Sequence, residues 1–210
     1  QIKSKIAHFT SRKAMNIDGL GQETIDLLYN EGLIKNIADL YELKKEEISK
    51  LNRLGDKSAE RILKGLDDSL QVPFTRVLFA LGIRYIGETV AKILVNRLIN
   101  INNIMNATFD ELIAIDEVGE RIAESLRLHF ANPDNILLVE RLKEKGLQMQ
   151  LDPATQSLRS NKLNGLSIII SGTFEKNSRD DLKKMIELNG GKNVSSISKN
   201  TNYLLAGDNI

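Results

Sequence analysis

The sequence contains no cysteine and no tryptophan, and only 3 of its 210 residues are proline. Without cysteine the chain can form neither a disulfide nor a thiolate metal site, which suits a reducing compartment such as the cytoplasm. It has no run of about eighteen apolar residues, so a membrane-spanning helix is not expected. The first ten residues, QIKSKIAHFT, lack the apolar segment of a secretory signal peptide. We therefore expect a globular, cytoplasmic protein without a membrane partner.

A large excess of one charge is missing as well. The chain has 29 basic and 28 acidic residues, which gives a net charge of +1. Residues 151–210 hold 8 basic and 6 acidic residues, and residues 1–150 hold 21 and 22. A protein that holds nucleic acid by bulk electrostatics shows a basic excess. Any phosphate binding by this chain must therefore be local, through backbone amides and a few well-placed cations.

The sequence does contain an internal repeat of one short motif. Each copy has an apolar residue, a glycine, three variable residues and then alanine or isoleucine. The copies lie at residues 20–25, 54–59, 86–91 and 118–123. Their glycines are separated by intervals of 34, 32 and 32 residues. Four copies at nearly constant spacing indicate a repeat architecture.

Helical periodicity flanks the copies of the motif. Apolar residues recur at helical spacing in the segments that follow the four glycines, at 22–31, 57–66, 88–98 and 120–130. Further helices are predicted at 3–9, 36–41, 45–51, 71–81, 108–115 and 135–145. Thr108 and Glu111 have the spacing of a capping box at one of these helix starts. The chain up to residue 150 is thus predicted to consist of helix pairs joined by short turns.

A glycine turn between two helices has a specific chemistry. The first backbone N–H groups of the second helix have no partner within that helix, and the helix dipole adds partial positive charge there. A phosphate oxygen suits this position, and the glycine is expected to supply positive φ and room for a close approach. The small residue four positions later (Ala59, Ala91 or Ala123) is expected to face the partner helix. Such a device reads the DNA backbone and not the bases.

The candidate DNA-binding residues are turn glycines and the cations within one helical turn of them. They are Gly19, Gly21, Gly55, Lys57, Arg84, Gly87 and Arg121. Glu117 would repel phosphate, so the fourth hairpin is expected to be largely structural. Cations farther along the helices are interpreted as solvated surface charges: Arg61, Lys64, Lys92, Arg97 and Arg127. The competing interpretation, that the glycines merely end helices, is weakened by the four copies in register.

Patterns typical of catalysis are absent from the sequence. Residues 19–24 read GLGQET, without the third glycine and the preceding strand of a dinucleotide site. His8 and His129 are isolated, and no carboxylates are spaced for metal binding or acid–base chemistry. No nucleophile-elbow or Walker pattern occurs. We therefore expect no catalytic, cofactor or metal site within these 210 residues.

The pattern changes after residue 150. Residues 151–161 are polar and lack a helical face, so they are predicted to be a linker. Residues 166–172 form a β-branched run ended by glycine, which suits a strand buried on both faces. An amphipathic helix at 179–189 and short strands at 192–195 and 202–206 follow. This segment is small for an independent α/β domain and is expected to be incomplete at its end.

Family resemblances rest on these motifs. The hairpins have the form h-x-G-h-G-x-x-x-A, which resembles the helix-hairpin-helix family. The whole array resembles the C-terminal half of bacterial NAD-dependent DNA ligases, on HFTSRKAMNIDGLG at 8–21, ADLY at 38–41, KSA at 57–59, FALGIR at 79–84 and Gly87-Glu88. The tail resembles the start of their BRCT domain, on SGTF at 171–174, SRDD at 178–181 and Gly190-Gly191. The expected fold class is mostly α, a tandem helix-hairpin-helix array followed by a small, truncated α/β (BRCT-like) domain.

The ligase resemblance also implies a domain order. Residues 1–16 would be a lead-in that follows a zinc finger, and residues 17–150 the helix-hairpin-helix domain with four repeats. The linker at 151–161 would lead to an incomplete BRCT-like domain at 162–210. The Lys-x-Asp-Gly motif of the family's adenylylation domain is absent here, and NIDG at 16–19 matches its last letters only by accident.

By the same resemblance, the intact enzyme moves AMP from NAD through a lysine to the 5′ phosphate at a nick and then seals the nick with Mg²⁺. NAD, Mg²⁺ and Zn²⁺ are implied for that enzyme, and no cofactor for this fragment. The fragment itself would be an inactive, DNA-binding portion that grips nicked double-stranded DNA in replication and repair, in the bacterial cytoplasm at the nucleoid.

Two other functions stay open at this point. The helical array could deliver the cleavage domain of a DNA-repair nuclease. Alternatively, the BRCT-like tail could bind a phosphorylated protein partner through Ser171 and Thr173.

Overall fold

The structure is a computed structural model, and it describes residues 2–52, 54–152, 161–175 and 177–208. The chain divides into two compact units, Gln1–Leu151 and Asp152–Ile210. Each unit is described by itself. Most of the expected linker at 151–161 lies outside the described residues.

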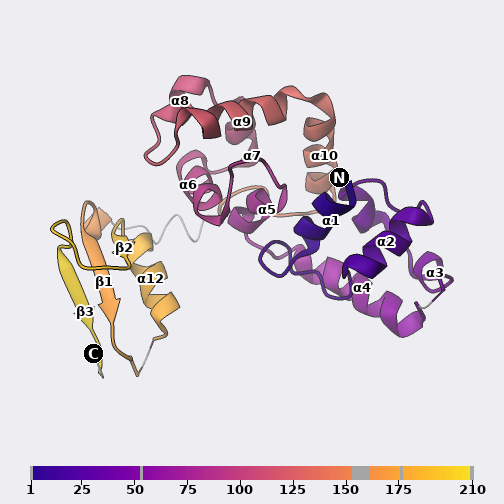
Figure 1. The fold of residues 1–210 in the computed structure, drawn as a ribbon, viewed down its shortest axis with the longest axis horizontal. Coiled ribbons are helices and arrows are strands. Elements are labelled where there is room, and N and C mark those ends of the chain that lie inside the picture. The colour runs from indigo at the N-terminus through magenta and orange to yellow at the C-terminus, as the bar shows by residue number, and fades with distance from the viewer. Residues whose placement is uncertain (1, 53, 153–160, 176, 209–210) are drawn as a thin grey trace. The chain divides into compact units, whose positions relative to one another are not determined.

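The described part of the first unit is built from helices (Figure 1). Their bounds are α1 (Ile2–Thr10), α2 (Gln22–Asn30), α3 (Lys45–Ile48), α4 (Asp56–Ser69), α5 (Phe74–Ala80), α6 (Glu88–Leu98), α7 (Ile101–Asn106), α8 (Phe109–Ile113), α9 (Glu120–Ala131) and α10 (Pro133–Glu144), with a 3₁₀ turn η1 (Ala38–Glu42). The helices pack in consecutive pairs around the repeated turns: α1 with α2, α3 with α4, α5 with α6 and α8 with α9. The predicted tandem of helical hairpins is confirmed.

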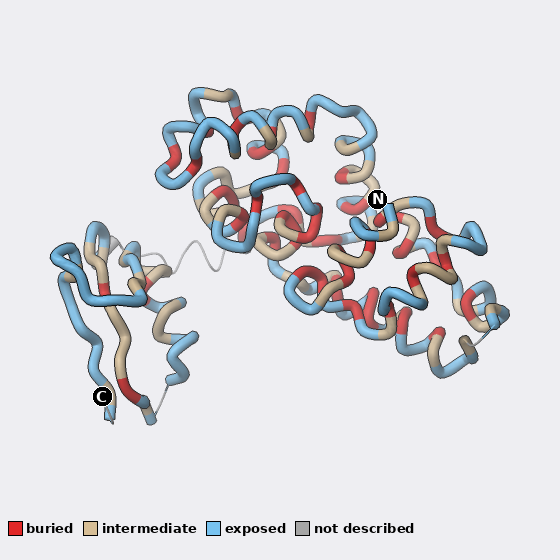
Figure 2. The backbone as a smooth tube through the Cα atoms, in the orientation of Figure 1, coloured by how far each residue is buried: buried red, intermediate tan, exposed pale blue. Residues whose placement is uncertain are grey.

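The core of the first unit lies where the paired helices cross. The small or branched residue four positions after each turn glycine is fully buried: Ile25, Ala59, Ala91 and Ala123 are all at 0% exposure. Figure 2 shows buried segments alternating with exposed ones along these helices. A small side chain at this position lets two helices approach closely, as expected from the sequence.

Local sequence signals explain several helix starts. Thr108 caps α8 in a capping box with Glu111, as predicted, because the Thr108 hydroxyl accepts a hydrogen bond from the Glu111 backbone N–H at 3.2 Å. Asn132 caps α10, whose first residue is Pro133, so this helix begins two residues earlier than the sequence predicted. Helix α7 was not anticipated; Asn100 caps it by accepting a hydrogen bond from the Asn103 N–H at 2.8 Å.

The second unit is a small α/β structure. Its strands β1 (Ser167–Ser171), β2 (Lys192–Val194) and β3 (Tyr203–Ala206) form a parallel sheet in the order β2-β1-β3. A 3₁₀ turn η2 (Asn161–Leu163) precedes β1, and helix α12 (Arg179–Leu188) packs against β1 and β2 (Figure 1). The predicted small α/β region is confirmed.

The expectation that β1 is buried on both faces is wrong for the described residues. Only Ile168 of this strand is buried, at 7% exposure, and its neighbours are partly exposed. On β3, Tyr203 and Leu204 are 59% and 49% exposed. Among the described residues, α12 is the one helix that packs on the sheet, and one helix layer covers one face only.

No helix in the described part of the chain combines the length and apolar character that crossing a bilayer requires.

Candidate nucleic-acid interface

The four hairpins present the same backbone geometry at the start of the second helix. The N-cap residues of α2, α4, α6 and α9 are Gly21, Gly55, Gly87 and Gly119, with φ of −76°, −102°, −81° and −84°. Each glycine is exposed and extended, and each helix start has no side-chain cap. The first i to i+4 hydrogen bond in each case runs to the glycine carbonyl, at 2.9 to 3.1 Å. The N–H groups of the first two residues of each helix are therefore left for an outside acceptor, whereas those of Ser58 and Ile122, the third residues of α4 and α9, donate to the glycine carbonyl at 3.0 Å.

The residue that bends each turn lies two positions before this glycine. Gly19, Tyr85 and Glu117 have φ of 83°, 65° and 70°. The fourth equivalent position, residue 53, is outside the described residues. The expectation that the N-cap glycines supply positive φ is wrong, because the chain reverses direction earlier in the turn and is already extended at the cap.

No neighbouring atom of the chain would clash with a side chain at the N-cap glycines. A Cβ atom built at residues 21, 55, 87 or 119 would have no other atom within 4 Å. Since their φ is negative, neither conformation nor internal packing requires glycine there. What glycine does provide is a bare backbone that an external group can approach closely. The geometry therefore fits an anion placed against the first-turn N–H groups.

Gly19 has a different role from the other glycines of the candidate set. A Cβ atom there would lie 2.9 Å from Cγ1 of Ile62 on α4. A Cβ atom on Gly65 of α4 would lie 2.9 Å from the backbone nitrogen of Asp18. The first turn thus rests directly on α4, and Gly19 is required by this packing and by its positive φ.

The three predicted cations lie exposed beside their turns. Lys57 and Arg121 occupy the second position of α4 and α9, and neither forms a salt bridge with any residue that the structure describes. The Arg84 guanidinium carbon lies 4.8 Å from the centroid of the Tyr85 ring. The Arg84 carbonyl accepts a hydrogen bond of 2.7 Å from the Ser125 hydroxyl on α9, which ties the third turn to the fourth hairpin.

Every hairpin has a carboxylate in the first helical turn of its second helix. These residues are Glu23, Asp56, Glu88 and Glu120. An acid here stabilises the helix through its dipole but repels a bound phosphate. At the third turn, Lys13 Nζ lies 3.3 Å from Glu88 Oε1 and offsets this charge. At the fourth turn, Glu117 is a second carboxylate beside the helix start.

Sequence reasoning did not select Lys13 or its neighbours. Arg76 donates hydrogen bonds to the carbonyls of Arg12 (2.7 Å) and Lys13 (3.2 Å), which fixes the loop after α1. Arg12 and Lys13 themselves are exposed. The place of Lys13 beside Glu88 follows from tertiary packing across 75 residues, so distance from a glycine along the chain could not reveal it.

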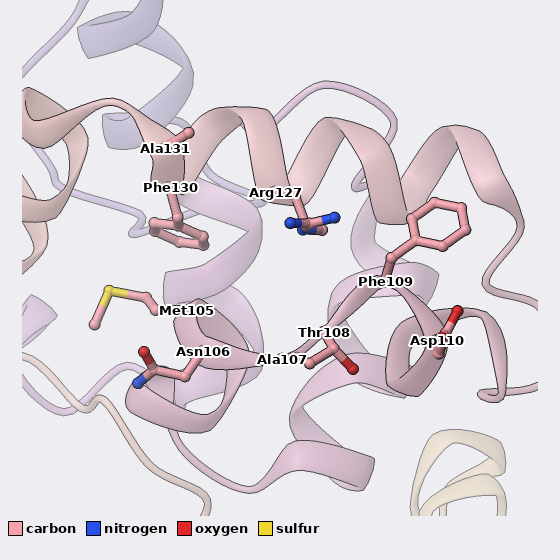
Figure 3. Close-up of a pocket in the computed structure, with 9 residues that line it drawn as sticks. All are labelled: Met105, Asn106, Ala107, Thr108, Phe109, Asp110, Arg127, Phe130 and Ala131. Carbon is pink, nitrogen blue, oxygen red and sulfur yellow. The ribbon is translucent and has the colours of Figure 1, made fainter.

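The structure also contains an open groove of about 560 Å³, away from the turn of the fourth hairpin (Figure 3). Residues 105–110 form one wall, and Arg127, Phe130 and Ala131 of α9 form the other. Figure 3 shows Arg127 between Phe109 and Phe130. Arg127 is eight residues beyond Gly119, or about 12 Å along the helix, so its side of the groove is separate from the fourth turn.

Both histidines are packed against other parts of the chain. His8 Nε2 lies 3.0 Å from the Phe79 carbonyl, and its ring meets the Phe79 ring edge-on. Burial, and to a lesser extent the Lys5 ammonium, lowers the pKa of His129 to about 4. Within the described ranges, no group of three or more His, Cys, Asp or Glu side chains is arranged to hold a metal ion.

Family models match both units of the chain. A SAM-like helix-hairpin-helix tandem matches residues 11–68 and a helix-hairpin-helix motif matches residues 76–139, so each model covers two of the four hairpins. A BRCA1 C Terminus (BRCT) domain matches residues 158–210.

Curated relatives align with the full chain. Proteins named DNA ligase from Phocaeicola vulgatus, Bacteroides fragilis and Flavobacterium psychrophilum are 54%, 55% and 52% identical over 210 residues. The alignments cover 100% of this chain and 32% of each relative, so the chain spans about a third of the length of the relatives. The whole chain is therefore similar to about a third of each of these proteins named DNA ligase, and it carries two helix-hairpin-helix matches followed by a BRCT match.

Proposed function

We propose that this chain is the DNA-binding portion of a DNA ligase and that it holds duplex DNA by its phosphates. The observation that carries the proposal is the set of open glycine N-caps, which are exposed and have no side-chain cap at the helix start. The relatives named DNA ligase support it. The turns at Gly21, Gly55 and Gly87 are the proposed contacts, with Lys57 and Arg84 beside them.

The proposed substrate is a nicked double-stranded DNA, bound without regard to base sequence. Backbone N–H groups and exposed cations contact phosphate oxygens, which carry no sequence information. The motif resemblance supports a NAD-dependent enzyme of replication and repair, which would work in the bacterial cytoplasm at the nucleoid.

The zinc site of such an enzyme does not fit the residues of this chain. The sequence has no cysteine for a zinc site, and the described residues form no metal-binding group. NAD, Mg²⁺ and Zn²⁺ would accordingly be bound by other parts of a longer protein, and this chain alone would not seal a nick.

No observation favours the phosphoprotein-binding alternative. The Thr173 hydroxyl already donates a hydrogen bond of 3.0 Å to the Asp208 carbonyl within the same unit. Its proton is therefore committed to the local structure and is not available to a phosphate oxygen.

The proposal is tested by titrating a fluorescent nicked duplex with the 210-residue chain and following anisotropy. Binding should weaken between about 50 and 200 mM salt, with a shallow slope of log K against log salt near −3 to −4, because only a few phosphates are neutralised. Two unrelated duplex sequences should bind equally well. Absence of binding at low salt, or a strong preference for one base sequence, would contradict the proposal.

A further inference from the structure

The first turn and the second hairpin form one surface in the folded chain. The Asp18-Gly19 turn rests on α4, since added Cβ atoms at Gly19 and Gly65 would lie 2.9 Å from Ile62 and from the Asp18 nitrogen, respectively. A side chain that leaves α4 at this level therefore lies beside the first turn, although it belongs to the second hairpin by sequence. Arg61 is such a side chain.

Arg61 is held by the first turn in a two-point contact. Its Nε donates to Asp18 Oδ2 at 2.7 Å and its Nη2 donates to Asp18 Oδ1 at 2.6 Å. The Gly19 backbone N–H donates to the same carboxylate at 3.0 Å and fixes it. The Arg61 hydrogen bond is the main cause of a lowered Asp18 pKa, so the carboxylate stays ionised near neutral pH.

The contact leaves most of the guanidinium donors available. An arginine has five N–H donors in a planar fork, and the Asp18 carboxylate takes two of them. The other three point away from Asp18, and the Arg61 side chain is 63% exposed. A planar guanidinium that is oriented on one side and open on the other suits a phosphate oxygen pair on its free side.

The first hairpin has no cation of its own at its turn. Residues 16–24, NIDGLGQET, contain neither lysine nor arginine. Asp18 and Gly21 are three residues apart, which limits their separation to about 11 Å. Arg61 is therefore within reach of the phosphate at Gly21 or of its neighbour on the same strand.

We propose that Arg61 is a phosphate-binding residue of the first hairpin, supplied by the second hairpin and oriented by Asp18. The inference rests on the proposed function, because the phosphate is that of the bound duplex. The first phosphate site is then composite, with backbone N–H groups from α2 and a guanidinium from α4. Asp18 is a positioning residue that does not itself contact the DNA.

The test uses the 210-residue chain and the nicked fluorescent duplex at several salt concentrations. Arg61→Ala should lower affinity about five- to tenfold and make the salt slope less steep by about 0.9, the value for one lost phosphate contact. Arg61→Lys keeps the charge but cannot bridge a carboxylate and a phosphate with a planar fork, so it should recover only part of the affinity. Arg127→Ala, which removes an equally exposed arginine from the groove in Figure 3, should leave affinity and slope unchanged.

Asp18→Asn separates orientation from charge. If charge alone mattered, removing this carboxylate would tighten binding. If Asp18 orients Arg61, the variant should bind no better than the natural chain, and adding Arg61→Ala to it should cost less than in the natural background. Because the pair is exposed on both sides, these changes should barely alter the thermal midpoint.

Gly21→Val distinguishes failure of the proposed role of Arg61 from failure of the proposed DNA contact at the first hairpin. If Gly21→Val weakens binding while Arg61→Ala leaves affinity and slope unchanged, the role of Arg61 is wrong and the proposed function stands. If neither variant changes binding, the proposed use of the first hairpin fails as well.

Discussion

At the scale of single residues, two groups of glycines in the first unit differ in what surrounds them. The four N-cap glycines have negative φ and open space where a Cβ would stand. Gly19 and Gly65 are different, because a Cβ at either would press on Ile62 or on the backbone of Asp18. The repeat of glycines was predictable from the sequence. The sequence could not predict which glycines are needed for internal packing and which leave space for a ligand, because the residue type is the same in both cases.

Gly87→Val is the substitution that separates these roles. We expect it to weaken binding to a nicked duplex about tenfold, because the side chain would occupy the space that a phosphate needs. The free energy of unfolding should fall by less than about 1 kcal/mol, since φ is −81° and no atom lies within 4 Å. Anisotropy and urea denaturation measure the two quantities.

Gly65→Val is the matched control for this substitution. Its side chain would meet the Asp18 backbone at 2.9 Å, so it should destabilise the fold markedly. Should Gly87→Val destabilise the chain as much as Gly65→Val does, the glycine at 87 is structural and the proposed contact loses its basis.

His129 predicts an acid-sensitive step in stability. Its pKa is lowered to about 4 in the folded chain, from an ordinary value of 6.5. Between these values the unfolded state binds a proton that the folded state does not, so the free energy of unfolding falls as pH drops from about 6.5 to 4. After allowance for partial exposure the loss is about 2 kcal/mol. Urea denaturation at pH 7 and pH 5 should show a smaller difference for His129→Gln, and an equal difference in both proteins would exclude this cause.

At the scale of elements, Arg141 connects α10 to η1. Its Nη2 donates to Asp39 Oδ1 at 2.8 Å and to Glu42 Oε1 at 3.0 Å, and its side chain is 27% exposed. Burial alone would raise the pKa of Asp39, but hydrogen bonds from Arg141 and from two backbone N–H groups lower it overall. The contact joins residues 102 positions apart, so periodicity and spacing could not predict it.

Arg141→Met tests this contact while keeping the apolar stem of the side chain. We expect the free energy of unfolding to fall by about 1 kcal/mol, because Asp39 is left partly buried without its main partner. In a double-mutant cycle with Asp39→Asn, the two losses should be less than additive. Strictly additive losses in urea denaturation would show that the two side chains are not coupled.

The helix pairs were predicted from the sequence because long periodic segments and glycine turns are strong signals. Helix α7 was missed because its six residues contain only a short apolar pattern, Ile101 and Ile104, among asparagines. The burial of β1 was overestimated because a run of isoleucines reports apolar character and not how many layers cover it. The contacts of Arg61 with Asp18 and of Lys13 with Glu88 were not predicted, because the partners lie 43 and 75 residues apart in the sequence.

At the scale of the whole molecule, the proposed interface to a polyanion has to be explained in a chain whose net charge is only +1. The structure offers backbone N–H groups at repeated turns, which carry no formal charge, and only a few exposed cations beside them. Carboxylates at the same helix starts keep the total near zero while stabilising the helices. The central claim is that affinity comes from these turns and not from overall charge.

The most direct measurement is the affinity of a variant with valine at Gly21, Gly55 and Gly87 for a nicked duplex at about 50 mM salt. None of these substitutions alters net charge, and circular dichroism verifies that the helices are retained. The account predicts a loss of about a hundredfold or more, or roughly 3 kcal/mol of binding free energy, and less than about threefold for Gly119→Val alone. A folded triple variant that binds within about threefold of the natural chain would contradict the central claim.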